Sequence, residues 1–299
     1  MSGRTAFAED ATPLKCEQTE SALASIQDQA ERGDANAQLD LAKLYRKRGC
    51  FPDDKRDEIA FGWIEKAAEQ GLSEAQVELA SSYLYGKGVK MDVDKGLNMY
   101  HTLATQNVAV AEYDLGDVYM TGSPDEENTI RPDTNKALFW YETAANKGML
   151  IQAMNRLGAL YRDQNQTFYD LDTSSSWFRK AAESGDIFAM IDLAGNLLKS
   201  NLDVSNEEAA EWYRKAAELG AAKAQYALAR SYALGRGVQR DQETAYTWYL
   251  IAKSRKYDVE TEFGKELIDQ LSKAEILEAE ENAKEWRKTH LPSSLAMKD

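Results

Sequence analysis

A motif that recurs about every 36 residues constrains the fold of this chain more than any other feature. Each full copy starts with a small residue and carries Trp at offset 3, a large apolar residue at offset 4, Ala at offsets 7 and 8, and Gly at offset 11. Full copies start at Ala60, Ala137, Ser174 and Ala209, and partial copies start at Gly96 and Ala245. Offsets 0, 3, 4, 7 and 8 share one face of a helix, and Gly is typical of the residue that ends one.

A second motif alternates with these copies along the chain. It starts at Ala37, Ala75, Ala111, Ala153, Ala189 and Ala224. Counted from that Ala as position zero, position four is Leu and position five is Ala or Gly. This spacing is again helical, and one helix pair cannot bury its apolar face without a neighbouring pair. The sequence therefore predicts an all-α fold, a right-handed α-solenoid (superhelix) of about six helix-turn-helix repeats with the Trp residues in its core.

The two ends of the chain depart from the motifs, as the capping segments of solenoids do. We expect a disordered N-terminus over 1–12, an N-terminal capping helix over 13–33 and the repeat array over 34–258. A single C-terminal capping helix is expected over 259–290, followed by a flexible tail over 291–299. The charged face of that last helix would separate the final repeat from water.

The motifs resemble the Sel-one-like repeat (SLR, or Sel1-like repeat) family, which is related to tetratricopeptide (TPR) repeats. The turns Gly86-Lys87-Gly88-Val89 and Gly235-Arg236-Gly237-Val238 match the turn between that family's helices, and Asp92 and Asp241 stand where the family has Asp. The resemblance covers about 37–253, and the loops at 122–135 and 162–172 depart from it. It implies a TPR-like α-solenoid that acts as a non-catalytic scaffold for protein–protein interaction.

In this family the second helices line the concave side of the superhelix, so the resemblance places position three on that face. Position three is acidic in four of the first five repeats. Together with its neighbours, the predicted partner-binding face comprises Asp40, Lys43, Glu78, Tyr113, Asp114, Asp117, Asn155, Arg156, Asp192, Tyr226 and Arg230. Like charges held side by side repel each other, which favours a role in binding a basic protein partner. The alternative interpretation is ordinary solvent exposure in an acidic chain.

The charge balance argues against two classes of partner. The chain has 36 Lys and Arg against 50 Asp and Glu, which gives a net charge of −14. This charge opposes binding to nucleic acid and to anionic membranes. No stretch of the sequence approaches the roughly 18 apolar residues of a membrane span, so membrane insertion is not expected.

The sequence carries no recognised catalytic or cofactor motif. Its two histidines, His101 and His290, are far apart, and H-E-x-x-H, Walker, G-x-S-x-G and C-x-x-C motifs are all missing. We therefore predict no enzyme activity, no cofactor and no metal site. A catalytic role would require a site of a type that the sequence does not reveal.

The compartment depends on two weak signals. Cys16 and Cys50 would lie at the same end of an antiparallel helix pair, where a disulfide would stabilise the N-terminal cap, and some SLR relatives are secreted with disulfides inside helix pairs. The alternative is two unrelated buried thiols. Ala6-Phe7-Ala8 has the form of a signal-peptidase site without an apolar segment before it, so either the match is chance or a leader precedes it. A periplasmic or secreted location is expected, with a cytoplasmic one as the alternative.

The family resemblance leaves several roles open. The favoured hypothesis is a monomeric bacterial envelope adaptor or regulator that binds a protein partner on the concave face. An immunity protein that neutralises a secreted toxin or effector is the alternative within the same class. A binder or hydrolase of a cell-wall fragment is the alternative of another class, and it predicts a pocket with convergent polar groups.

Overall fold

The computed structural model describes residues 20–47, 55–125, 129–147, 150–199, 203–255, 257 and 260–290. Within these ranges every regular element is a helix, so the predicted all-α repeat fold is confirmed. The helices are α1 (Glu20–Glu31), α2 (Ala35–Arg46), α3 (Arg56–Glu69), α4 (Ser73–Tyr85), α5 (Val93–Thr105), α6 (Ala109–Thr121), α7 (Thr134–Lys147), α8 (Ile151–Arg162), α9 (Leu171–Glu183), α10 (Ile187–Leu197), α11 (Asp203–Glu218), α12 (Ala222–Leu234), α13 (Gln242–Ser254), α14 (Thr261–Ile268) and α15 (Lys273–His290).

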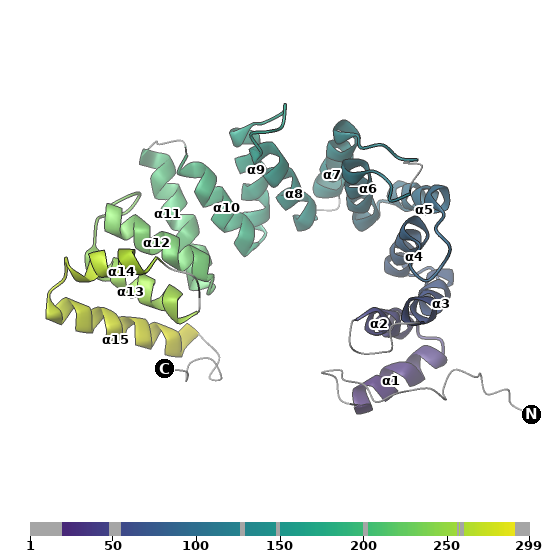
Figure 1. Ribbon diagram of the computed structural model, residues 1–299, viewed down its shortest axis with the longest axis horizontal. Coiled ribbons are helices and arrows are strands. Elements are labelled where there is room, and N and C mark those ends of the chain that lie inside the picture. Colours follow the sequence, from purple (N-terminus) through teal and green to yellow (C-terminus); the bar gives the residue numbers. More distant parts are fainter. Residues whose placement is uncertain are drawn as a thin grey trace, which may run out of the picture. The chain divides into compact units, whose positions relative to one another are not determined.

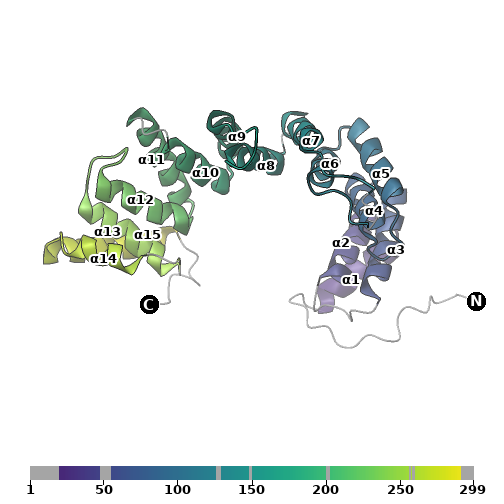
Figure 2. The same ribbon diagram turned by 45° about the horizontal axis from the view of Figure 1, so that its top comes forward.

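The chain forms two compact units, residues 1–153 and residues 154–299, whose boundary falls inside α8. In the first unit, successive helices from α1 to α7 pack against each other in chain order (Figure 1). The second unit repeats this arrangement from α9 to α13, and α15 then packs along α13 (Figure 2). Contacts between sequence neighbours are what a repeat array requires.

Aspartates fix where many of the helices begin. The side chains of Asp34, Asp92 and Asp241 each accept a hydrogen bond from the backbone N–H three residues later, at 2.8, 2.9 and 3.0 Å. Asp170 and Asp186 cap α9 and α10 in the same way. Each cap satisfies a backbone donor that the first helical turn leaves without a partner. The Asp positions that the family resemblance singled out are therefore helix caps.

Where the structure describes the terminal Gly or Asn of the motif, the helix ends as predicted. Gly71, which follows α3, has φ +85°, in the left-handed region that a side chain makes costly. In the degenerate repeat, Asn107 takes this role with φ 60°. Asn is the side chain best suited to replace Gly there, because it tolerates the left-handed conformation.

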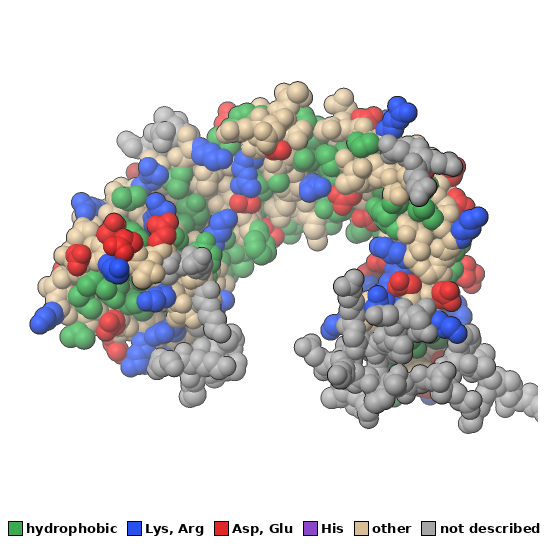
Figure 3. All heavy atoms as spheres, in the orientation of Figure 1, with side chains coloured by type: hydrophobic (Ala, Val, Ile, Leu, Met, Phe, Trp, Pro, Cys, Tyr) green, Lys and Arg blue, Asp and Glu red, His purple; other side chains and the backbone are tan. Residues whose placement is uncertain are grey.

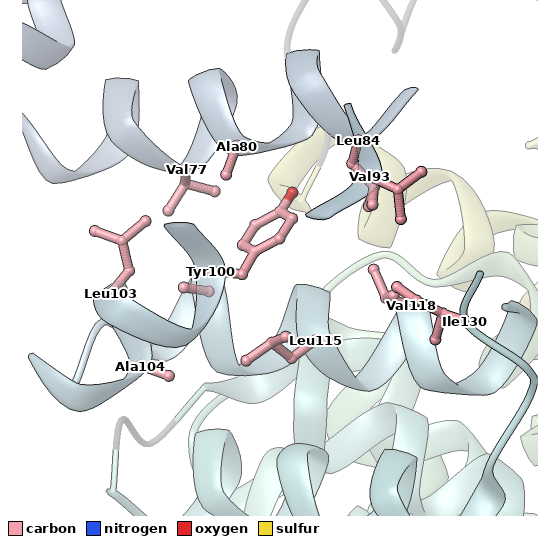
Figure 4. Close-up of a cluster of buried hydrophobic side chains, with 11 residues drawn as sticks. Val77, Ala80, Leu84, Val93, Tyr100, Leu103, Ala104, Leu115, Val118 and Ile130 are labelled. Atoms are coloured by element: carbon pink, nitrogen blue, oxygen red, sulfur yellow. The ribbon is translucent and has the colours of Figure 1, made fainter. Parts of the chain in front are cut away.

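At three junctions, position five of a second helix receives the aromatic residue at offset 4 of the next copy. A Cβ atom added to Gly116 would lie 2.4 Å from the ring of Tyr141, and one added to Gly158 would lie 2.7 Å from the ring of Phe178. Where position five is Ala80, the buried ring of Tyr100 lies between α4 and Leu115 of α6 (Figure 4). Burying each such side chain contributes about 1.5–3 kcal/mol, so these contacts hold neighbouring repeats together.

A buried polar link joins α8, α9 and α10 in the second unit. The hydroxyl of Ser174 donates to the Gly158 carbonyl at 2.6 Å, and the amide of Asn196 donates to that hydroxyl at 2.9 Å. Ser174 is fully buried. Small residues at offset 0 thus allow close approach, and here the hydroxyl also accepts a hydrogen bond from the Asn196 amide.

The C-terminal cap differs from its prediction. In place of one helix over 259–290, the structure has α14 and α15, with a turn between them. Ser272 and Glu275 form a capping box: the Ser272 N–H donates to the Glu275 carboxylate at 2.7 Å, and the Glu275 N–H donates to the Ser272 hydroxyl at 3.3 Å. This reciprocal pair starts a new helix at Lys273. Trp286 of α15 then packs against Trp248 of α13, with ring centroids 5.8 Å apart.

Several expectations fall outside what the structure describes. Cys16, Cys50, the segment 1–12 and the tail 291–299 all lie outside the described residues, and α1 is described from Glu20 onward. The disulfide and the right-handed superhelix therefore remain predictions.

The G-x-G-V turn has a steric requirement at its second glycine. Gly88 has φ +76°, and a Cβ atom there would lie 1.9 Å from the backbone oxygen of Asp57 at the start of α3. Gly237 meets the backbone oxygen of Asn206 at the same distance in the second unit. Gly71 has a similar φ, but a Cβ atom added there would have no atom within 4 Å. A substitution at Gly71 therefore causes conformational strain alone, whereas one at Gly88 also causes steric overlap.

We predict that Gly88→Ala lowers the free energy of unfolding by at least ~2 kcal/mol more than Gly71→Ala, which should cost about 1–2 kcal/mol. The extra loss arises because the turn must move away from α3. Urea unfolding of the two variants checks this, and equal losses would contradict it.

Candidate partner-binding faces

In the first unit, the predicted site residues lie on the second helices α2, α4 and α6. Asp40 and Lys43 are exposed on α2, and the Lys43 ammonium lies 2.6 Å from the carboxylate of Glu74 on α4. Both members of this ion pair are solvated, so it contributes about 0–1 kcal/mol. Its effect is to orient Lys43 toward the next repeat.

Arginines at position nine pair with acids at position three of the following repeat. The Arg46 guanidinium lies 2.9 Å from the Glu78 carboxylate and donates to the Ser82 hydroxyl at 2.8 Å. In the second unit, Arg162 lies 3.0 Å from Asp192 and above the ring of Phe178. Two acids of the predicted ladder, Glu78 and Asp192, thus have internal cations.

Asp114 has no arginine in the corresponding place, because position nine of the preceding repeat is the buried Leu84. Its carboxylate instead accepts a hydrogen bond from the Tyr100 hydroxyl. Burial raises the pKa of Asp114 to about 6, and the charges of Asp117 and Glu78 add to this effect. The Tyr100 hydrogen bond and the more weakly acting positive charge of Lys87 oppose it. This carboxylate is half-buried and close to two other acids.

Aromatic residues surround the same place on the first unit. The Tyr141 hydroxyl donates to the Asp117 carboxylate at 2.6 Å, and the Tyr113 and Tyr141 ring centroids are 5.5 Å apart. The charges of Asp114 and Asp117 also raise the pKa of Tyr85 beyond the effect of its burial. We call Glu78, Tyr85, Tyr113, Asp114 and Asp117 the α4–α6 acidic face.

The second unit uses its predicted residues differently. Asn155 and Arg156 lie on α8, both partly buried, while Arg230 is exposed on α12. Tyr226 packs against Phe263 and Tyr257, with ring centroids 5.7 and 6.0 Å away, so much of its ring is used inside the unit.

The residues that sequence reasoning missed are Arg46, Arg162, Tyr100 and Tyr141. A register rule would have found the two arginines, because both stand at position nine and their acids stand at position three of the next repeat. Figure 3 shows acidic and basic side chains interspersed on the drawn face of each unit. Internal pairing of this kind reduces the like-charge repulsion that the acidic ladder suggested.

Two open hollows are lined by residues outside the predicted site. One, of about 670 Å³ in the first unit, is lined by Gln76, Asp92, Lys95, Asn98 and Gln106 among others. The other, of about 760 Å³ in the second unit, lies beside the Gly235–Gly237 turn and includes Glu211, Arg214 and Tyr232.

Two features are missing from the described part of the chain. No described helix has both the length and the apolar character needed to cross a bilayer. Among the same residues, no group of three or more His, Cys, Asp or Glu could hold a metal ion.

Comparison with known proteins agrees with the repeats seen here. The Sel1 repeat matches residues 35–72, 73–108, 109–149, 151–186, 187–220 and 222–257. The chitin synthase regulator SKT5 of Saccharomyces cerevisiae is 30% identical over 226 residues, which is 70% of this chain and 32% of the regulator. This chain thus spans about a third of that relative's length.

Two crystal structures share this fold. The protective antigen c5321 of uropathogenic Escherichia coli, described as displaying an SLR fold, aligns with a TM-score of 0.65 and 27% identity over 93% of this chain and 59% of the antigen. A Sel1 repeat protein from Oxalobacter formigenes aligns with a TM-score of 0.52 and 27% identity over 80% of this chain and 92% of its own. The chain belongs to the Sel1 repeat family, whose members generally mediate protein–protein interaction.

We predict that Asp114→Asn stabilises the first unit at pH 8 by about 1–3 kcal/mol and has little effect at pH 4. The raised pKa means that the stability associated with protonated Asp114 is complete at low pH and is lost as the pH rises through about 6. Urea unfolding at both pH values checks this. Asp40→Asn, at the equivalent exposed position, should change little, and a gain from Asp114→Asn at pH 4 as large as at pH 8 would contradict the prediction.

Proposed function

We propose that this chain is a non-catalytic scaffold that binds a basic segment of a partner protein through the α4–α6 acidic face. The observation that carries the proposal concerns the position-three acid Asp114. For this acid, position nine of the preceding repeat is Leu84 rather than an arginine. A lysine or arginine from a partner would relieve the repulsion among Asp114, Asp117 and Glu78, which adds to the effect of burial on the pKa of Asp114.

The surroundings of Asp114 support recognition of a protein. Tyr85 is 39% exposed, and Tyr113 is partly exposed on the same helix as Asp114. Tyr side chains beside charged groups are typical anchors of protein interfaces. Because these residues lie on packed helices rather than loops, little conformational entropy would be lost on binding.

The local chemistry supports a binding role over a catalytic one. His101 lies on α5 with its ring 5.5 Å from that of Trp140, and burial lowers its pKa. Its other ring neighbour is Tyr119, whose hydroxyl lies 3.4 Å from the His101 Nε2 atom. The other described histidine, His290, stacks on Trp286 in the second unit.

A regulatory or adaptor role is the form of scaffold that we favour. The relatives with curated names include chitin synthase regulators, although this chain spans a third or less of their lengths. We place the protein in the bacterial envelope, as a periplasmic or secreted protein that works as a monomer. An immunity protein is the alternative, and it requires that the basic partner be a toxin or effector.

The experiment that tests the proposal is quantitative capture, with the purified full chain as bait, from envelope and soluble fractions of the source organism. We expect one basic protein to be retained at near-equal stoichiometry. A variant with Glu78→Gln, Asp114→Asn and Asp117→Asn, which removes the three acids of the α4–α6 acidic face, should reduce its capture at least about tenfold. The control variant Glu58→Gln, Glu69→Gln and Asp94→Asn removes three exposed acids from first helices and should retain it.

The expected pH dependence follows from Asp114. Capture should weaken as the pH falls through about 6, because protonation removes the charge that attracts the partner. Equal losses in the two variants would overturn the assignment of the face. Retention of a glycan or muropeptide in place of a protein would favour the binder of a cell-wall fragment.

A further inference from the structure

In three repeats, the side chain at position one of the second helix forms the same hydrogen bond. The side-chain amides of Gln38, Gln76 and Gln225 donate to the carbonyls of Ala30, Ala68 and Ala217, at 3.1, 3.4 and 3.0 Å. Each carbonyl stands eight residues earlier, in the last turn of the preceding helix, and also accepts the N–H of the Gly three residues after it. The glutamine thus ties the start of one helix to the end of the helix before it.

The third repeat has Glu112 at this position, and the fourth and fifth have the buried residues Met154 and Met190. Glu112 is 1% exposed, and neither of its carboxyl oxygens has a hydrogen-bond partner among the described residues. The carbonyl eight residues earlier is that of Ala104, which accepts the Asn107 N–H at 3.0 Å as in the other repeats. An ionised carboxylate cannot donate to that oxygen, whereas a protonated carboxyl can.

Among the described residues, burial and the charge of Lys147 act on Glu112. Burial raises its pKa, and the positive charge of Lys147 at the end of α7 opposes that effect. From α5, the group that the repeat register brings to Glu112 is the uncharged Ala104 carbonyl. On α6 itself the nearest acid along the sequence is Asp114, whose pKa is raised to about 6 by its own burial.

We propose that Glu112 makes the α5–α6 turn pH-sensitive: in its protonated form it donates to the Ala104 carbonyl as glutamine does elsewhere, and on ionisation it loses that bond. This inference is independent of partner binding. The stabilisation by the protonated form is complete below the pKa of an unfolded glutamate and is lost as the pH rises through the higher pKa of the folded state. Local opening of the turn should therefore become more frequent toward neutral and alkaline pH.

Hydrogen exchange of the full chain tests the proposal. Asp114→Asn is present throughout, because the pKa of Asp114, about 6, lies inside the pH range of the measurement. The reporters are the Asn107 and Val108 amides, which donate to the Ala104 and Leu103 carbonyls across the turn. After correction for intrinsic exchange, their protection should fall about tenfold between pH 5 and pH 8. Addition of Glu112→Gln should remove this fall.

The converse substitution provides a matched control in the second unit. Gln225 is fully buried, and Gln225→Glu should create a similar fall in protection at Gly220, whose N–H donates to the Ala217 carbonyl. Failure of that variant to fold at pH 8, together with folding at pH 5, would also support the proposal. The decisive comparison remains the Asp114→Asn chain with and without Glu112→Gln, because these two proteins differ only at the residue in question.

Two results would overturn the proposal. One is an unchanged fall in protection when Glu112→Gln is added. The other is a carboxyl carbon of Glu112 that titrates, by nuclear magnetic resonance, in the range of exposed glutamates. Lys147→Met is expected to move that titration to higher pH, since it removes the charge that favours the carboxylate.

Discussion

The packing of neighbouring repeats depends on the lack of bulk at position five of each second helix. Gly116 and Gly158 leave space that the rings of Tyr141 and Phe178 fill, and Ala80 does the same for Tyr100. A single methyl group at either glycine would overlap the opposite ring. The aromatic residue at offset 4 and the small residue at position five are therefore two halves of one contact, which explains why both recur with the same period.

Much of the fold follows from local signals in the sequence. Helical periodicity, the Asp caps and the Gly or Asn at helix ends each act within a few residues, so they can be read without knowing the tertiary structure. The break between α14 and α15 was missed even though Ser272 and Glu275 carry a capping-box signature, because the apolar spacing through that region suits one longer helix. A local signal was present there, but periodicity outweighed it.

The candidate site was harder to predict, because it depends on which residues meet across repeats. The sequence placed Glu78 and Asp114 at the same position and so suggested equivalent roles. In the structure Glu78 meets Arg46, whereas Asp114 meets Tyr100, because the preceding repeat has Leu84 where arginine would stand. Burial raises the pKa of Asp114. The difference arises from a residue about 30 positions away, which periodicity alone does not connect to the site.

The contact at position five also limits how such a chain could change by duplication. In such a repeat, the small residue packs against the aromatic residue of the next repeat, and the aromatic residue packs against the small residue of the previous one. A duplicated repeat therefore brings a compatible residue to both of its new junctions. A junction with Gly at position five cannot be replaced directly by one with Ala, since the ring of Tyr141 lies too close to Gly116 to leave space for a Cβ atom. An additional repeat would interrupt one junction and create two new ones. It should therefore be tolerated most readily where both new junctions have the same pair of small and aromatic residues as the interrupted one.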